Sequence, residues 1–174
     1  METTGLFSLE HRIIEACIKR YEWSGVPEDP HTLIDSVTWR INPERSIDAK
    51  AREVHGISES DLLAEPKWGV VAPLISARMD SCDVVVAHNG LSFDFPFLLQ
   101  EFKRVGVDDP DVIPFDTMVD GTWATPFGKS PTLAELCWAS GVPYDATEAH
   151  AADYDVEVMM QCFFHGIKRK VFSL

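Results

Sequence analysis

The stretch from Val84 to Asp94 reads VVVAHNGLSFD. Its first four residues form a short apolar run, which is typical of a strand buried inside a sheet. A polar turn follows, and the next residues predict a helix over 93–105. Ligands of open α/β sheets bind beyond the carboxyl ends of the strands, so we expect Asp94 at that edge, on the first turn of its helix. The helix N-terminus favours the ionised carboxylate that a metal ligand requires, although aspartate is equally common there for structural reasons alone.

The rest of the chain predicts an α/β domain with a mixed sheet. Apolar and polar residues alternate over 12–21 and 33–41, which indicates two antiparallel strands. Spacing and turn residues predict a strand over 112–115 and helices over 48–54, 68–79, 132–139 and 151–168. Pro73 either kinks the second of these helices or marks its true first turn. Since no linker interrupts the chain, residues 1–174 are interpreted as a single domain.

Composition indicates an ordinary globular protein, because 45% of the 174 residues are hydrophobic and 25% are charged. No apolar run approaches the ~20 residues of a membrane span, and the first residues do not resemble a signal peptide. The four cysteines are scattered, which favours free thiols over zinc ligands or disulfides. We therefore expect no membrane partner and a location in the reducing cytoplasm.

The formal net charge is −13, which argues against a protein that coats duplex DNA, because such binders are usually basic. Bound cations reverse the local sign of the potential. The charge is therefore compatible with a metal site that takes one strand end.

The last predicted helix is preceded by His150 and carries Asp155 one turn in. A loop histidine can swing toward a water held by a metal on this aspartate, which would place a general base beside a two-metal cluster. Taken alone, the pair is more often a loop histidine and a surface helix aspartate. Asp153 and Glu157 are interpreted as solvated charges.

The chain begins with Glu2-Thr3-Thr4-Gly5 after its methionine. A carboxylate followed by two hydroxyls and a glycine suits a turn after a strand, where the carboxylate can bind metal while turn N–H groups approach a phosphate. The segment alone is weak support, because chain termini are usually frayed.

Together the three segments resemble the motifs of the DEDDh branch of the DnaQ-like 3′→5′ exonucleases, a family that includes the proofreading subunit of bacterial DNA polymerase III. Residues 2–5 are similar to the second half of its first motif, D-x-E-[ST]-[ST]-G. His88-Asn89 with Phe93-Asp94 is similar to the second motif, with three residues between Asn89 and Phe93 where the bacterial proofreading subunits usually have two. His150, Ala152 and Asp155 match the third, H-x-A-x-x-D. Intervening segments such as 115–117 and 132–137 also resemble the family, so nearly the whole chain is covered in order.

The resemblance implies a ribonuclease H-like mixed sheet flanked by helices, and a site that holds two divalent cations, Mg²⁺ or Mn²⁺. It implies that Glu2, Asp94 and Asp155 are metal ligands and that His150 is the general base. The residues that would shape the nucleotide pocket are Thr3, Thr4, His55, Asn89 and Phe93. A core role for Phe93 fits the sequence equally well, and we assign no catalytic role to Asp116.

The family motif has an aspartate two positions before its glutamate, and Met1 here stands at the variable position between them. We expect this aspartate, and the apolar central strand before it, to lie upstream, in a natural chain that begins about ten residues earlier. Removal of a central strand leaves unpaired backbone, so the 174 residues are expected to fold poorly alone.

The expected function is a metal-dependent 3′→5′ exonuclease that acts on the 3′ end of single-stranded DNA. An RNA exonuclease is a close second, because sugar discrimination depends on pocket contacts that the sequence does not specify. A third alternative is a catalytically degenerate module that binds nucleic acid or docks on a polymerase. The absent aspartate favours this third alternative, whereas the intact His150 and Asp155 favour catalysis.

Overall fold

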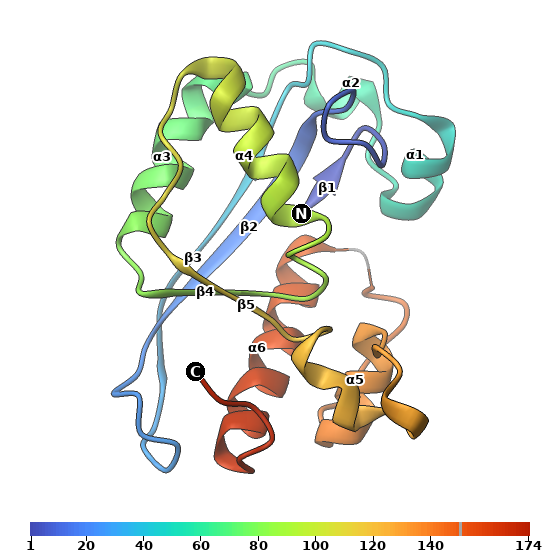
Figure 1. Ribbon diagram of the computed structural model, residues 1–174. Coiled ribbons are helices and arrows are strands. Elements are labelled where there is room, and N and C mark those ends of the chain that lie inside the picture. Colours follow the sequence, from blue (N-terminus) through green and yellow to red (C-terminus); the bar gives the residue numbers. More distant parts are fainter. Residues whose placement is uncertain (150) are drawn as a thin grey trace.

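The computed structural model describes every residue of the chain except residue 150 (Figure 1). Five strands are formed, namely β1 (Glu2–Thr3), β2 (Ile13–Glu22), β3 (Thr32–Arg40), β4 (Val84–Ala87) and β5 (Ile113–Asp116). The α-helices are α1 (Ala49–His55), α2 (Glu59–Leu62), α3 (Trp68–Asp80), α4 (Asp94–Val105), α5 (Leu133–Ser140) and α6 (Ala152–Lys168). Two short 3₁₀ helices, η1 (Asp120–Ala124) and η2 (Pro126–Gly128), connect β5 to α5.

The strands form one antiparallel and one parallel ladder. The antiparallel ladder has the order β1-β2-β3, and β4 pairs with β5 in parallel. The expected antiparallel pair over 12–21 and 33–41 is thereby confirmed, as is the mixed α/β class. Parallel pairing of β4 and β5 brings their carboxyl ends to one edge, where Ala87 lies opposite Asp116.

The first strand differs from the expectation. The sequence indicated a turn at residues 2–5 and a first strand wholly upstream of Met1. Instead Glu2 and Thr3 form β1, because their backbone pairs with Glu15 and Ile13 of β2. Residues 2 and 3 are therefore a strand and not a turn.

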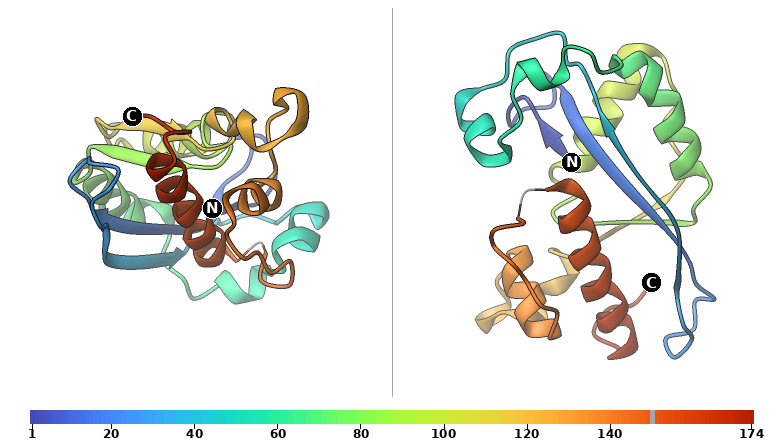
Figure 2. Two further views of the ribbon diagram at one scale, coloured as in Figure 1. Left: turned by 90° about the horizontal axis from the view of Figure 1, so that it is seen from below. Right: turned by 180° about the vertical axis from the view of Figure 1, so that it is seen from behind.

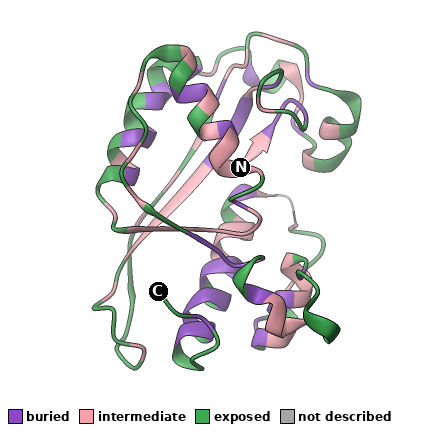
Figure 3. Cartoon of the chain, viewed as in Figure 1, coloured by how far each residue is buried: buried purple, intermediate pink, exposed green. Residues whose placement is uncertain are grey.

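The strands lie between two helical layers (Figures 1 and 2). Val85 of β4 packs into a core with α3 and α4, whereas Val84 and Val86 pack into a second core with α5 and α6. Burial follows this arrangement, with exposed residues on the outer helix faces (Figure 3). Because side chains alternate along a strand, a continuous apolar run such as β4 can bury both of its faces.

Local signals fixed several helix boundaries. Thr132 caps α5, accepting a hydrogen bond from the backbone N–H of Glu135, and Gly141 ends the helix with a left-handed φ of 75°. Pro73 lies inside α3, which begins at Trp68, so the alternative that this proline marks the first turn is wrong. The indole N–H of Trp68 donates to the carbonyl of Glu101, 2.9 Å away, and ties the start of α3 to α4.

All four cysteines are free, as expected, and the two buried ones are Cys137 and Cys162. No helix among the described residues is both long and apolar enough to cross a membrane.

Candidate active site

The loop between β4 and α4 places Asp94 at the carboxyl edge of the parallel strands. Asn89 has a left-handed φ of 65°, and its carbonyl accepts a hydrogen bond from the backbone N–H of Phe93 (3.0 Å). Phe93 is the residue before the helix, and Asp94 is the first residue of α4. Asp94 therefore lies on the first turn of α4, as the sequence predicted, next to the loop that follows the carboxyl end of β4.

Asp94 is largely surrounded by protein. Its side chain is 24% exposed, and its Oδ1 lies 3.9 Å from the amino nitrogen of Met1. Burial raises the pKa of the Asp94 carboxyl above its ordinary value, and the positive amino group opposes this shift. A carboxylate in such surroundings is stabilised by a nearby cation.

Glu2 lies on β1, directly opposite Glu15 of β2. Burial raises the pKa of Glu2 to about 7; the amino terminus opposes the shift, while the charges of Asp155, Glu15 and Asp94 add to it. The contact between Met1 and Asp94 places the start of β1 beside α4. The charges that act on Glu2 come from β2, α4 and α6. Glu2, Asp94 and Asp155 are the three residues that the sequence predicts as metal ligands, and this role stays a prediction.

Asp155 lies in the first turn of α6, where its backbone N–H donates to the carbonyl of Ala151 (3.0 Å). The neighbouring residue predicted as general base, His150, lies outside the described residues. Its predicted role therefore stays a prediction.

Metal-ligating geometry is not preformed in the described part of the chain. Among residues 1–149 and 151–174, no group of three or more His, Cys, Asp or Glu side chains is arranged to hold an ion. The donors in the region are carboxylate oxygens, which suit Mg²⁺ or Mn²⁺, and their mutual repulsion opposes close approach unless a cation compensates it. The chemistry of Glu2, Asp94 and Asp155 thus fits the expected ions, and their sharing of an ion stays a prediction.

The hydroxyls of Thr3 and Thr4 are both engaged within the chain. Thr3 Oγ1 donates to the carbonyl of Gly5 (2.7 Å). Thr4 Oγ1 accepts from the backbone N–H of Arg12 (3.0 Å) and lies 3.1 Å from His11 Nδ1. Since Thr4 is fully buried, its side chain shapes the site by holding the loop that follows β1.

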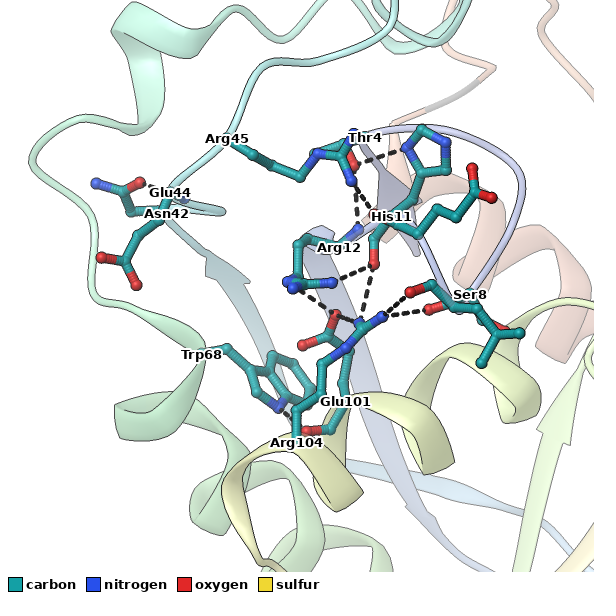
Figure 4. A network of polar contacts seen from close by, with 12 residues as sticks. Thr4, Ser8, His11, Arg12, Asn42, Glu44, Arg45, Trp68, Glu101 and Arg104 are labelled. Atoms are coloured by element: carbon teal, nitrogen blue, oxygen red, sulfur yellow. Dashed lines mark hydrogen bonds and ion pairs between the residues drawn. The ribbon is translucent and has the colours of Figure 1, made fainter.

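Figure 4 shows how that loop, residues 5–11, is fixed to α4. The guanidinium of Arg104 donates to the carbonyls of Ser8 (2.7 Å), Leu9 (2.6 Å) and His11 (2.9 Å). The same group forms an ion pair with Glu101, whose side chain is only 2% exposed. Three apolar side chains of the anchored loop face solvent, namely Leu6, Phe7 and Leu9.

The other predicted pocket residues occupy different settings. His55 is the last residue of α1, and its Nδ1 accepts from the backbone N–H of Ile57 (3.0 Å). Phe93 is half-buried and packs on Phe97, with ring centroids 5.0 Å apart, which agrees with the core role allowed by the sequence. The backbone N–H of Asn89 donates to Asp116.

Glu15 and the pair of Glu101 and Arg104 were not predicted from the sequence. A glutamate within the apolar run Ile13-Ile14-Glu15-Ala16 was a signal, because buried carboxylates are rare without a partner. Arg40 supplies that partner, with Nε 3.0 Å from Glu15 Oε2. Nothing in the local pattern of α4 indicated that Glu101 would be buried.

Comparisons with known proteins agree with this architecture. The chain is 27% identical over 164 residues to the PolC-type DNA polymerase III of Mycoplasma pneumoniae, covering 94% of this chain but only 11% of that protein. It is 29% identical over 192 residues to three prime repair exonuclease 2 of Mus musculus, covering 95% of this chain and 80% of that protein. It is 28% identical over 184 residues to ribonuclease T of Hahella chejuensis, covering 97% and 81%.

Among solved structures, the zinc-bound E. coli ExoI–ssDNA complex superposes with a TM-score of 0.81 at 18% identity, over 97% of this chain and 39% of that one. This likeness shows the ribonuclease H-like fold. The exonuclease (RNase_T) family model matches residues 1–163. The chain therefore belongs to the exonuclease family.

Proposed function

We propose that this chain is a metal-dependent 3′→5′ exonuclease that hydrolyses phosphodiester bonds at the 3′ end of single-stranded DNA. One observation carries the proposal: Asp94 Oδ1 lies 3.9 Å from the amino nitrogen of Met1, the residue before Glu2, so two of the predicted ligands come from neighbouring parts of β1 and α4. The pKa of Glu2 is raised chiefly by burial, and the charges of Asp155 and Asp94 add to this shift. Carboxylates crowded in this way favour the binding of divalent cations.

Glu2, Asp94 and Asp155 would hold two ions, Mg²⁺ or Mn²⁺. Such ions, when bound, stabilise the charge on the attacking and leaving oxygens of an in-line displacement. His150, as a neutral imidazole, would accept the proton of the attacking water, a role typically worth ~10²–10⁴-fold in rate. Asp94 is suited to its role by the N-terminus of α4, which favours a negative carboxylate.

The anchored loop, residues 5–11, would contact the terminal nucleotides. Its exposed Leu6, Phe7 and Leu9 offer apolar surface, and bases of single strands stack on such surface without sequence preference. The net charge of −13 favours contact with one strand end over contact with a long duplex.

DNA is the favoured substrate because the relatives include three prime repair exonuclease 2 and a structural neighbour complexed with single-stranded DNA. Ribonuclease T is about as similar, so RNA is the second candidate. Digestion of DNA and RNA oligomers of one sequence, side by side, distinguishes them. A higher kcat/KM on RNA would reverse our assignment.

The test of catalysis is the release of mononucleotides from a 5′-labelled single-stranded oligomer. We expect release with Mg²⁺, none with EDTA or in Asp155→Ala, and a strong decrease in His150→Ala. Asp153→Ala is the matched control, since Asp153 is an exposed aspartate on the same helical turn and should keep full activity. Equal release in EDTA would contradict the metal mechanism.

A non-catalytic module is a second candidate, because the described residues hold no preformed metal-ligating group. It would bind a strand end or dock on a polymerase, the context suggested by the PolC-type relatives. Binding of an oligomer without release of nucleotides in either Mg²⁺ or Mn²⁺ would favour this alternative.

We also propose that residues 1–174 form one domain, since side chains of β4 pack into the cores beneath both helical layers.

A further inference from the structure

Asp116 is a buried carboxylate at the end of β5, only 1% exposed. It lies beside Ala87, the last residue of β4. Its Oδ1 accepts a hydrogen bond from the backbone N–H of Asn89 (2.9 Å), and its Oδ2 accepts one from the backbone N–H of Leu91 (3.0 Å). One side chain thus holds two amides of the loop that leads to Asp94.

The same carboxylate also binds its own turn. Oδ1 accepts from the backbone N–H groups of Met118 (2.9 Å) and Val119 (3.4 Å). Thr117 adds a second link between the two strand ends, because its backbone N–H donates a hydrogen bond to the carbonyl of Ala87 (2.8 Å). The loops that follow β4 and β5 are therefore joined into one unit.

Only a carboxylate satisfies this arrangement. Both of its oxygens accept and neither donates, and four N–H groups converge on them. An asparagine in its place keeps one accepting oxygen, and its amide group meets another donor. If the oxygen stays with the three donors at Oδ1, the amide group faces the N–H of Leu91, which then loses its acceptor.

We propose that Asp116 is a positioning residue for Asp94. By fixing the amides of Asn89 and Leu91, it sets the loop that begins α4 and so holds the carboxylate of Asp94 where Glu2 and Asp155 can share a cation with it. The inference rests on the proposed function for its catalytic consequence, whereas its structural part is independent of any activity.

Amide hydrogen exchange of the wild-type chain is the first test. The amides of Asn89 and Leu91 lie in a loop, yet we expect them to exchange at least about tenfold more slowly than unbonded loop amides, as bonds to charged acceptors require. Exchange at unprotected rates would overturn the proposal, and this measurement needs neither a variant nor activity.

Asp116→Asn is the second test, with Glu135→Gln as the matched control. Glu135 also accepts a backbone N–H, that of Thr132 (2.8 Å), but on α5. In Asp116→Asn we expect faster exchange at Leu91, weaker Mn²⁺ binding by electron paramagnetic resonance, and a kcat lowered about 10²-fold with little change in KM. The control should match the wild type in Mn²⁺ binding, kcat and KM.

Unchanged exchange and unchanged Mn²⁺ affinity in Asp116→Asn would overturn the positioning role. If the wild type releases no nucleotides, the proposed function fails, while the exchange data still decide whether Asp116 fixes the loop. If Asp116→Asn fails to fold, the wild-type exchange rates of Asn89 and Leu91 decide alone.

Discussion

Glu2 of β1 and Glu15 of β2 lie directly opposite one another in the antiparallel ladder. Like charges in this position destabilise a strand pair. Arg40 compensates Glu15 through an ion pair, with Nε 3.0 Å from Oε2. Among residues 1–149 and 151–174, no arginine or lysine forms an ion pair with Glu2, and we expect its charge to be stabilised instead by a cation bound beside it.

The metal-free protein should therefore lose stability as Glu2 ionises. The folded pKa of about 7 exceeds the ordinary 4.5, so the contribution of protonated Glu2 is complete below about pH 4.5 and lost as the pH rises through 7. In EDTA, the free energy of unfolding should fall between about pH 5 and pH 8 by on the order of 2 kcal/mol more in the wild type than in Glu2→Gln.

Chemical denaturation at several pH values measures this difference. At pH 8, Mg²⁺ should raise the melting temperature of the wild type and leave that of Glu2→Gln unchanged. Parallel pH profiles for the two proteins in EDTA would contradict the pKa assigned to Glu2.

Arg104→Gln should destabilise the chain by about 3 kcal/mol, because it leaves the buried carboxylate of Glu101 without its closest cation. The substitution also frees the carbonyls of Ser8 and Leu9. In the double variant Glu101→Gln/Arg104→Gln, part of the loss should be recovered, since no buried charge remains. Urea denaturation measures both, and equal stability of the single variant and the wild type would refute the anchoring role.

Gly5→Ala should destabilise the loop after β1 by about 1–3 kcal/mol, the usual effect of overpacking. A Cβ at this position would lie 2.3 Å from Cε1 of His11, the ring that contacts Thr4. Gly69→Ala is the control, because its nearest neighbour, Val105 Cγ1, would be at an ordinary 3.8 Å. Thermal unfolding should show a lower melting temperature for the first variant only.

Phe7→Ala should weaken binding of single-stranded oligomers about tenfold, the usual size of one base–aromatic contact, with little change in stability. Phe7 is 68% exposed on the anchored loop beside β1. Phe127 is exposed as well but lies on η2, a separate segment between β5 and α5, so Phe127→Ala should bind like the wild type. Fluorescence anisotropy with a labelled oligomer compares them, and equal affinities would exclude the loop from the binding surface.

Much of the secondary structure could be predicted from the sequence, including the places of Asp94 and Asp155 in the first turns of α4 and α6. The alternation that marked β2 and β3 reflects the period of a strand, and Thr132 and Gly141 marked the ends of α5 through bonds within a few residues. Such signals are local, because the interacting groups lie close together along the chain.

The chain's sequence was enough to predict β2 to β5 and the longer helices in order, together with the three acidic segments, but not β1. The pairing of Glu2 with Glu15, the burial of Glu101 with Arg104 and the contact of Asp116 with the loop before Asp94 came only from the folded structure. The contact of Glu2 with Glu15 joins two strands, and the contact of Asp116 with Asn89 joins two loops. The burial of Glu101 depends on the residues that pack over it. Register and burial arise when the whole sheet and its helices pack together, and no periodic pattern in one segment records them.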